Sequence, residues 1–334
     1  MAYTAKIVSC LIGLAILLSG QGCHFVSCEQ CLIKSDYRWQ ETDSTIALLN
    51  SEKIVWQLNH GKQQGQPYFH PLSSNDGTEL TALRPKDHPW HRGLWFSWKY
   101  INGVNYWDPE IPPGQTDVIN FESRLNKDYS AEIEMSISYH PPQESAVLTE
   151  KRFIAAAAPD KNGCYYIDWF TIFTAGDNNV LLDRTALPGE KGGKSYGGYG
   201  GLSLRMAEYT KSWHFVGSEG PLEPESRGSY ARWVDFSGKI ANGQTAGVTI
   251  FDYPENPSHP SSWWLSGSMP FFSPAVLIHK PLTLSAGQSL TLRYRIYVHT
   301  GASNKATLEN IWKGLLATRD PAIAKSPPHL EKIP

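Results

Sequence analysis

The sequence predicts an all-β protein, an antiparallel β-sandwich with one short helix near its C-terminal end. Apolar and polar side chains alternate along several stretches, which is the two-residue period of a strand. Clusters rich in Gly, Pro, Asn and Asp separate these stretches, such as NDG, APDKNG and DYPENPSHP, and these residue types favour turns. Only residues 304–320 have the apolar period of a helix. Short alternating strands followed by one helix favour a sandwich in a single domain.

The first residues of the chain predict an export signal. Lys6 precedes the apolar run IVSCLIGLAILL, and the small residues of SGQGC follow it. This order is typical of a secretory signal peptide, here residues 1–22, and the run is short for a membrane span. Cys23 stands where a lipoprotein carries its acylated cysteine. We therefore expect an exported protein that is periplasmic, extracellular or an outer-membrane lipoprotein, with contact to a membrane only through such an anchor.

The remaining chain predicts one domain at residues 36–320 and a loose tail at 321–334, which is rich in proline and charge. Of the 334 residues, 41% are apolar, and the formal net charge is −2. This charge gives no basic stripe for a nucleic-acid backbone, so nucleic acid is not an expected partner. Small molecules or neutral polymers are the expected ligands.

Two stretches give the clearest strand signals. In AEIEMSISY, the residues Ile133, Met135, Ile137 and Tyr139 share one face, and polar residues occupy the other. SLTLRYRIYVHTG, which begins at residue 289, alternates in the same way. In the predicted helix, an apolar stripe is formed by Leu308, Ile311, Trp312 and Leu315.

Residues 86–110, KDHPWHRGLWFSWKYINGVNYWDPE, combine two histidines with four tryptophans. Neither a core strand nor a solvated loop favours this mixture, whereas a substrate cleft needs aromatic faces beside titratable groups. Asn102-Gly103 predicts a type I′ hairpin. If the strand before this hairpin begins at Gly93, its second face carries Trp95 and, one step back, His91.

His88 and His91 are candidate acid/base residues, because imidazole titrates near neutrality and transfers protons to sugar carbons or oxygens. Pro89 and Gly93 oppose a helix here, but a turn at Pro89 brings both rings together. Asp87 is placed to hold one ring in a chosen tautomer. The alternative is that the histidines brace this turn through backbone carbonyls.

Several motifs together resemble the DUF6807 family, exported bacterial proteins often labelled "methane oxygenase PmoA". The resemblance rests on DHPWHRGLW at residues 87–95 and INGVNYW at 101–107. PYFHPLSSNDG precedes them at 67–77, YGGLSLR follows at 199–205, FDYPENPSHPSSWW at 251–264, and a C-terminal stretch at 274–301. Together they cover about residues 54–301, and their order is more specific than any single motif.

The resemblance implies a galactose-mutarotase-like sandwich that acts on carbohydrate. Asp87, His88 and His91 match the family and form the centre of the expected site. Further matching positions are expected to bind substrate around them: Arg92, Tyr199, Arg205, Asp252, Asn256, His259 and Trp263. Trp90 stands where the family often has histidine. Membrane methane oxygenases have several spans and this chain has none after its signal region, so we interpret the label as a misnomer.

We expect a carbohydrate-active enzyme, of hydrolase, lyase or epimerase type, with a saccharide or glycoside as its substrate and no cofactor. Trp263 or Trp264 is a candidate for stacking on a sugar, and Asp108 and Glu110 are candidate carboxylates. Arg92 and Arg205 are candidates to clamp a uronate carboxylate or a sulfate. One alternative is a non-catalytic carbohydrate-binding protein. The second is a metal-dependent oxygenase with a transition metal at His88 and His91.

Overall fold

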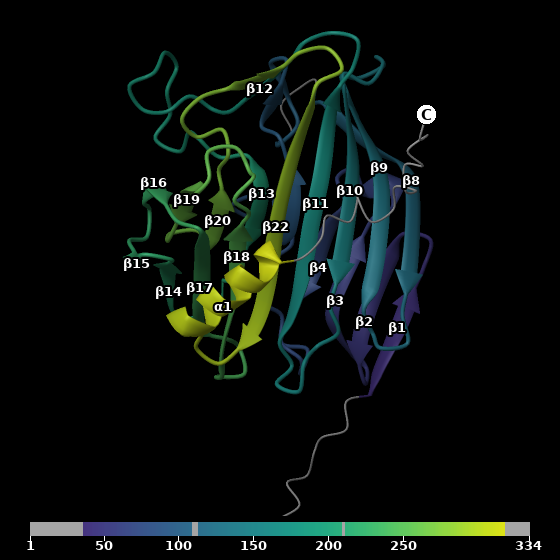
Figure 1. The fold of residues 1–334 in the computed structure, drawn as a ribbon, viewed down its shortest axis with the longest axis vertical. Helices are drawn as coiled ribbons and strands as arrows, with labels where there is room; N and C mark the ends of the chain where they lie inside the picture. Colours follow the sequence, from purple (N-terminus) through teal and green to yellow (C-terminus); the bar gives the residue numbers. More distant parts are fainter. Residues whose placement is uncertain (1–35, 109–112, 209–210, 318–334) are drawn as a thin grey trace, which may run out of the picture. The chain divides into compact units, whose positions relative to one another are not determined.

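The computed structural model describes residues 36–108, 113–208 and 211–317. The predicted signal peptide, Cys23, Glu110 and the predicted tail lie outside these residues. Within them, the structure has no helix with the length and apolar character needed to cross a membrane. The predicted all-β sandwich with a C-terminal helix is confirmed (Figure 1).

The first sheet is antiparallel and contains nine strands. In spatial order they are β1 (Tyr37–Glu41), β2 (Thr45–Asn50), β3 (Lys53–Asn59), β4 (Tyr68–Leu72), β5 (Leu94–Ser97), β13 (Gly201–Arg205), β20 (Phe271–Pro274), β19 (Ser262–Ser266) and β16 (Arg227–Tyr230). A 3-10 turn, η1 (Lys62–Gln64), joins β3 to β4. Strands distant in sequence, such as β5 and β13, therefore become neighbours in this sheet.

The second sheet also contains nine antiparallel strands. Their spatial order is β15 (Gly220–Leu222), β14 (Lys211–Gly217), β17 (Trp233–Lys239), β18 (Thr245–Asp252), β22 (Ser289–Thr300), β11 (Tyr165–Ala175), β10 (Leu148–Ala156), β9 (Ala131–His140) and β8 (Gln115–Leu125). Both stretches with the clearest alternation belong to it, as β9 and β22. The predicted apolar face of β9 is buried.

A third, four-stranded sheet comprises β21 (Leu282–Leu284), β12 (Val180–Asp183), β6 (Tyr100–Ile101) and β7 (Val104–Asn105). The hairpin between β6 and β7 is the predicted one, since Asn102 and Gly103 have φ values of 51° and 79°. Both residues therefore adopt the left-handed conformation that a type I′ turn requires. This hairpin fixes the path of the chain toward Trp107.

Side chains from the two large sheets meet in a common core. The Phe69 ring of β4 lies 6.3 Å from that of Trp169 on β11, and the Phe96 ring of β5 lies 4.9 Å from that of Phe173. The opposite face of the first sheet carries a second aromatic cluster, which includes Trp95. Because side chains alternate along a strand, one apolar strand supplies both the core and this second cluster.

The helix α1 (Lys305–Leu316) lies over the outer face of the second sheet near β17 and β22 (Figure 1). The side chain of Asn304 caps its first turn by accepting a hydrogen bond from the backbone N–H of Thr307 at 2.9 Å. Leu308 and Leu315 are buried against Trp233 and Phe251. The predicted helix and its apolar stripe are therefore present.

Candidate functional site

A cavity of about 310 Å³ lies on the outward face of the first sheet. We call it the aromatic cavity; its lining residues are His88, Trp90, His91, Trp107, Asp108, Tyr196, Tyr199, Trp264, Met269 and Phe271. They come from β19, β20 and four connecting segments. Cavities of roughly 300–1,000 Å³ that combine apolar walls with a few polar groups are typical small-molecule sites.

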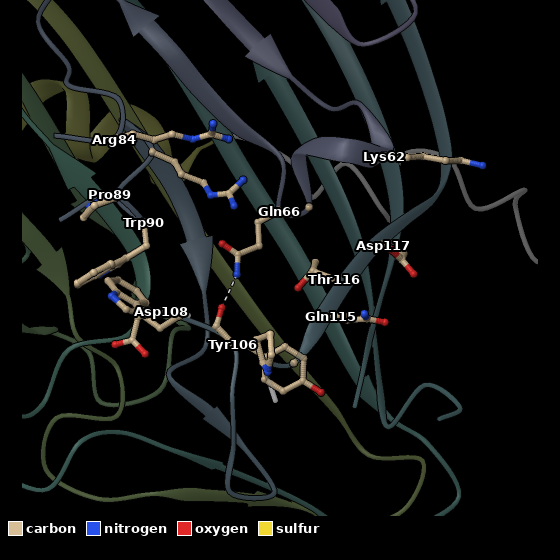
Figure 2. Close-up of a pocket in the computed structure, with 15 residues that line it drawn as sticks. Lys62, Gln66, Arg84, Pro89, Trp90, Tyr106, Asp108, Gln115, Thr116 and Asp117 are labelled. Carbon is tan, nitrogen blue, oxygen red and sulfur yellow. Dashed lines mark hydrogen bonds between the residues drawn. The ribbon is translucent and has the colours of Figure 1, made fainter. Parts of the chain in front are cut away.

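A second cavity, of about 670 Å³, adjoins the first and shares Trp90, Trp107 and Asp108 with it. We call it the polar cavity; its other lining residues include Lys62, Gln66, Arg84, Arg92, Gln115, Thr116 and Asp117. Figure 2 shows Arg84, Trp90 and Asp108 on one side and the residues of β8 on the other. Gln66 lies between them and donates a hydrogen bond to the carbonyl of Tyr106.

The loop between Leu83 and Arg92 carries the predicted acid/base residues into the aromatic cavity. A β-bridge joins Leu83 to Arg92, and the backbone N–H of Arg84 donates to the carbonyl of His91 at 2.8 Å. Inside the loop, a turn from His88 to His91 is closed by a 3.0 Å backbone hydrogen bond. Pro89 occupies the second position of this turn, which its fixed φ favours. The predicted turn therefore places the two imidazoles 4.6 Å apart.

Asp87 and His88 form a hydrogen-bonded pair at the cavity wall. The Nδ1 atom of His88 lies 2.9 Å from Oδ2 of Asp87, and Nη2 of Arg205 lies 3.0 Å from the same carboxylate oxygen. Partial burial opposes ionisation of Asp87, but the hydrogen bond with His88 and the charge of Arg205 keep its pKa below the ordinary value. An ionised carboxylate only accepts hydrogen bonds, so Nδ1 of His88 carries the proton and Nε2 remains for a ligand.

His91 lies deeper than His88 and is only 3% exposed. Its ring contacts those of Trp95 and Phe271 at centroid distances of 5.1 and 5.2 Å. Burial, followed by the charges of His88 and Arg205, lowers its pKa to about 2. His91 is therefore a neutral hydrogen-bonding group over the ordinary pH range, and of the two histidines His88 is the better proton carrier.

A buried lysine fixes a second carboxylate in the site. Lys99 is 2% exposed, and its Nζ atom lies 2.8 Å from Oδ2 of Asp108, while Asn105 donates to the other oxygen. Asp108 lines both cavities. Tyr199 faces the same lysine, with its ring centre 5.8 Å from Nζ. Burial raises the pKa of Tyr199 above its ordinary value, so its hydroxyl stays protonated.

The structure gathers six of the ten predicted site residues in or directly beside these cavities: Asp87, His88, His91, Arg92, Tyr199 and Arg205. Arg92 lines the polar cavity and donates from Nη1 to the carbonyl of Gln64. Arg205 is buried at 1% exposure and reaches the site through Asp87.

Asp252, Asn256 and His259 do not reach either cavity. Asp252 is fully buried, where Oδ1 accepts from Asn256 at 2.8 Å and Oδ2 pairs with Nδ1 of His259 at 2.7 Å. The His259 ring stacks on Trp312 of α1 at 6.3 Å. These three side chains therefore satisfy one another and join the loop after β18 to the helix, away from the proposed ligand.

Trp263 also lies outside the cavities, since it is fully buried in the core and its indole N–H donates to the carbonyl of Ala231 at 2.9 Å. Its neighbour Trp264 faces the aromatic cavity. The alternation of β19 sends the two indoles to opposite faces of the sheet. The sequence indicates which indole faces the core, because Trp263 lies two residues before the apolar Leu265 and therefore shares its face of the strand.

Sequence reasoning also missed Trp90, Tyr196, Met269 and Phe271 as lining residues. Phe271 occupies the outward position of β20, whereas Phe272 points into the core. Tyr196 is 51% exposed and belongs to the glycine-rich segment before β13. Such segments carry no period from which their facing could be inferred.

The metal hypothesis at His88 and His91 does not fit this geometry. Their rings stack with an angle of 25° between planes, and a metal ion binds nitrogen in the plane of each imidazole ring. Nearly parallel stacked planes do not converge on one ion. Among the described residues, no group of three or more His, Cys, Asp and Glu side chains is placed to hold a metal.

Most of the chain matches the model of a protein family. Residues 45–313 match the model of a protein family described as a family of unknown function, DUF6807. The match spans the second large sheet, all of the first sheet except β1, and most of α1. No curated protein matches the chain.

Proposed function

The chain belongs to the DUF6807 family, and we propose that it is an exported protein that binds a saccharide and transforms it by acid/base chemistry at His88. One observation carries the proposal. The Asp87–His88 pair, held by Arg205, opens into a cavity with aromatic walls. Export is supported by the order of residues 1–22 in the sequence.

The proton chemistry follows from the fixed tautomer of His88. With the proton on Nδ1, the Nε2 atom accepts a proton from a sugar carbon or hydroxyl, and the Asp87 carboxylate stabilises the imidazolium that forms. The protonated ring then returns the proton to a leaving oxygen or to another face of the same carbon. Removal of a proton from a carbon and its return in this way serve elimination and epimerisation. In hydrolysis the Nε2 atom instead takes the proton from the attacking water, whose oxygen replaces the leaving oxygen at the glycosidic carbon.

The cavity walls favour a saccharide over other small molecules. Pyranose rings present apolar C–H faces, which stack on the negative face of an indole, and Trp90, Trp107 and Trp264 line the aromatic cavity. Sugar hydroxyls need both donors and acceptors. Tyr199 supplies a hydroxyl, and the fixed carboxylate of Asp108 accepts hydrogen bonds.

A turnover screen with matched variants tests the proposal. The purified protein without residues 1–22 is incubated with neutral, uronic and oxidised glycosides, beside His88→Gln and His214→Gln. His214 is exposed on β14 and lines neither cavity. We expect product from the parent and from His214→Gln, and a loss of about 10²–10⁴-fold in His88→Gln. Turnover that survives in His88→Gln would contradict the assignment of the proton carrier.

Burial of His91 favours a second candidate function, that of a non-catalytic saccharide-binding protein. A neutral, buried imidazole among aromatic rings orients a ligand without proton transfer. Titration calorimetry on the same glycosides separates the two functions. Binding without product in the parent, with lower affinity in His91→Ala, supports the binding protein. Product in the parent supports the enzyme.

A further inference from the structure

Two arginines line the polar cavity without a carboxylate partner among the residues that the structure describes. Arg84 and Arg92 lie at the two ends of the loop that carries His88. Arg92 is half-buried, donates to the backbone carbonyl of Gln64, and lies 5.6 Å from the ring centre of Tyr68. A partly desolvated guanidinium is unfavourable unless an anion compensates its charge. Burial and the charge of Arg84 accordingly lower the pKa of Arg92.

The described acids of this cavity already have cationic partners. Asp108 pairs with Lys99 at 2.8 Å, and Asp117 pairs with Nε2 of His140 at 2.9 Å. The hydrogen bond with Asp117 raises the pKa of His140, which favours the charged pair. The positive charge of the two arginines is therefore left for a ligand.

The backbone at Arg84 supplies an independent indication. Arg84 has a φ of 49°, in the left-handed region that non-glycine residues avoid. Strain of this kind persists where the surrounding structure enforces it, and such residues cluster at ligand sites. Here the enforcement is the hydrogen bond from Arg84 to His91. Figure 2 shows Arg84 above Trp90, which is one of the residues that line both cavities.

We propose that Arg84 and Arg92 form a subsite for an anionic group of the saccharide, either the carboxylate of a uronic acid or a sulfate ester. The inference rests on the proposed function and names its substrate class. Guanidinium groups bind both oxyanions through paired, charge-assisted hydrogen bonds. A substrate whose sugar ring occupies the aromatic cavity places its charged substituent toward the loop ends. The His88 imidazole and the anion subsite then belong to one loop.

Affinity measurements on charged and neutral sugars test the subsite. The probes are galacturonate, galactose 6-sulfate and galactose, titrated calorimetrically into the parent, Arg84→Gln and Arg92→Gln, with Arg38→Gln as a control. Arg38 is an arginine on β1 that pairs with Glu52. We expect one charged sugar to bind at least about tenfold more tightly than galactose, as charge-assisted bonds imply. The preference should fall in both cavity variants, weaken with salt and persist in Arg38→Gln.

The outcomes separate this subsite from the proposed function. Equal affinity for the three sugars, or a preference that survives in both Arg84→Gln and Arg92→Gln, would overturn the subsite. Binding of galactose would still support the proposed function. If none of the three sugars binds and no glycoside of the turnover screen gives product, both the subsite and the proposed function are overturned. A preference for galacturonate assigns a carboxylate, and one for galactose 6-sulfate assigns a sulfate ester. Arg84 is exposed, so its variant carries the test if Arg92→Gln does not fold.

Discussion

At the scale of single residues, burial separates two histidines that the sequence presents as equals. His88 is partly exposed and hydrogen-bonded to a carboxylate, whereas His91 is packed among aromatic rings. A proton carrier must be reached by substrate and must tolerate both charge states. His88 can be reached from the cavity and has the Asp87 carboxylate beside it, and His91 is suited to holding the ligand and the loop.

The role of Asp87 leads to a prediction about turnover. In Asp87→Asn the amide NH₂ group can donate to Nδ1 of His88, which reverses the tautomer and removes the basic nitrogen from the cavity. We expect kcat to fall by about 10²–10⁴-fold, as when other paired histidines lose their carboxylate. Steady-state kinetics with the glycoside identified in the screen measures this.

Glu208→Gln is the matched control, because Glu208 is the other acidic partner of Arg205, at 3.1 Å, and does not contact His88. It should keep kcat within a factor of about 3 of the parent, because the Glu208 carboxylate is exposed and such pairs contribute little. Equal losses in both variants would mean that Arg205, and not the histidine tautomer, controls the rate.

The left-handed backbone at Arg84 leads to a prediction about stability. Arg84→Gly and Arg84→Ala both remove the guanidinium, but only alanine keeps a Cβ in the left-handed conformation. We expect the glycine variant to have a free energy of unfolding about 1 kcal/mol higher than that of the alanine variant. Urea denaturation measures the difference, and both variants should lose the preference for charged sugars equally. An alanine variant as stable as the glycine one would show that the loop relaxes.

At the scale of elements, β5 explains how the sheet builds the site. Leu94 and Phe96 point into the core between the sheets, and Trp95 points to the outer aromatic cluster beside His91. Gly93, directly before the strand, has a φ of 72°, and a Cβ there would lie 2.5 Å from the carbonyl oxygen of Phe69. The junction of loop and strand therefore requires glycine for two separate reasons.

Two glycine substitutions should differ in cost for this reason. Gly103 also has a positive φ, but a Cβ there would have no neighbour within 4 Å. We expect Gly103→Ala to lower the free energy of unfolding by about 1–2 kcal/mol, from backbone strain alone. Gly93→Ala also displaces β4, and it should lower the free energy of unfolding by about 2–4 kcal/mol. It should weaken saccharide binding as well. Chemical denaturation and calorimetry compare them, and equal costs would contradict the steric argument.

The sequence contained enough information for the strands, the hairpin and α1, because periodicity and turn chemistry are local. It did not contain the pairing of β5 with β13, since these two strands meet only in the folded sheet. The Asp252 cluster illustrates the same limit. Its acid, amide and histidine resemble a site in sequence, but in the structure they satisfy one another beneath α1.

At the scale of the whole molecule, the first sheet and the segments that cover its outer side withdraw two histidines from water. His91 and His70 are both affected: burial lowers the pKa of His70 to about 4, and that of His91 to about 2. Neither takes up a proton in the folded protein until the pH is well below the value of about 6.5 at which an unfolded histidine titrates. The folded state is therefore linked to pH through these two residues.

The sign of this linkage predicts loss of stability in acid. Above about pH 6.5 both histidines are neutral in the folded and in the unfolded protein, so they give the free energy of unfolding no pH dependence. Below this pH the unfolded protein binds protons at these residues and the folded protein does not. Each histidine should then reduce the free energy of unfolding by up to about 1.4 kcal/mol per pH unit between about pH 6 and pH 4.5. Denaturant titrations of the parent and of His91→Gln at several pH values measure this. Subtracting the free energy of unfolding of the variant from that of the parent cancels the contributions of the other titrating groups. This difference should decrease as the pH falls, by the slope given for one histidine. Parallel curves would mean that His91 takes up its proton at the same pH in the folded and unfolded protein. The assignment of His88 as the proton carrier would then lose its physical basis.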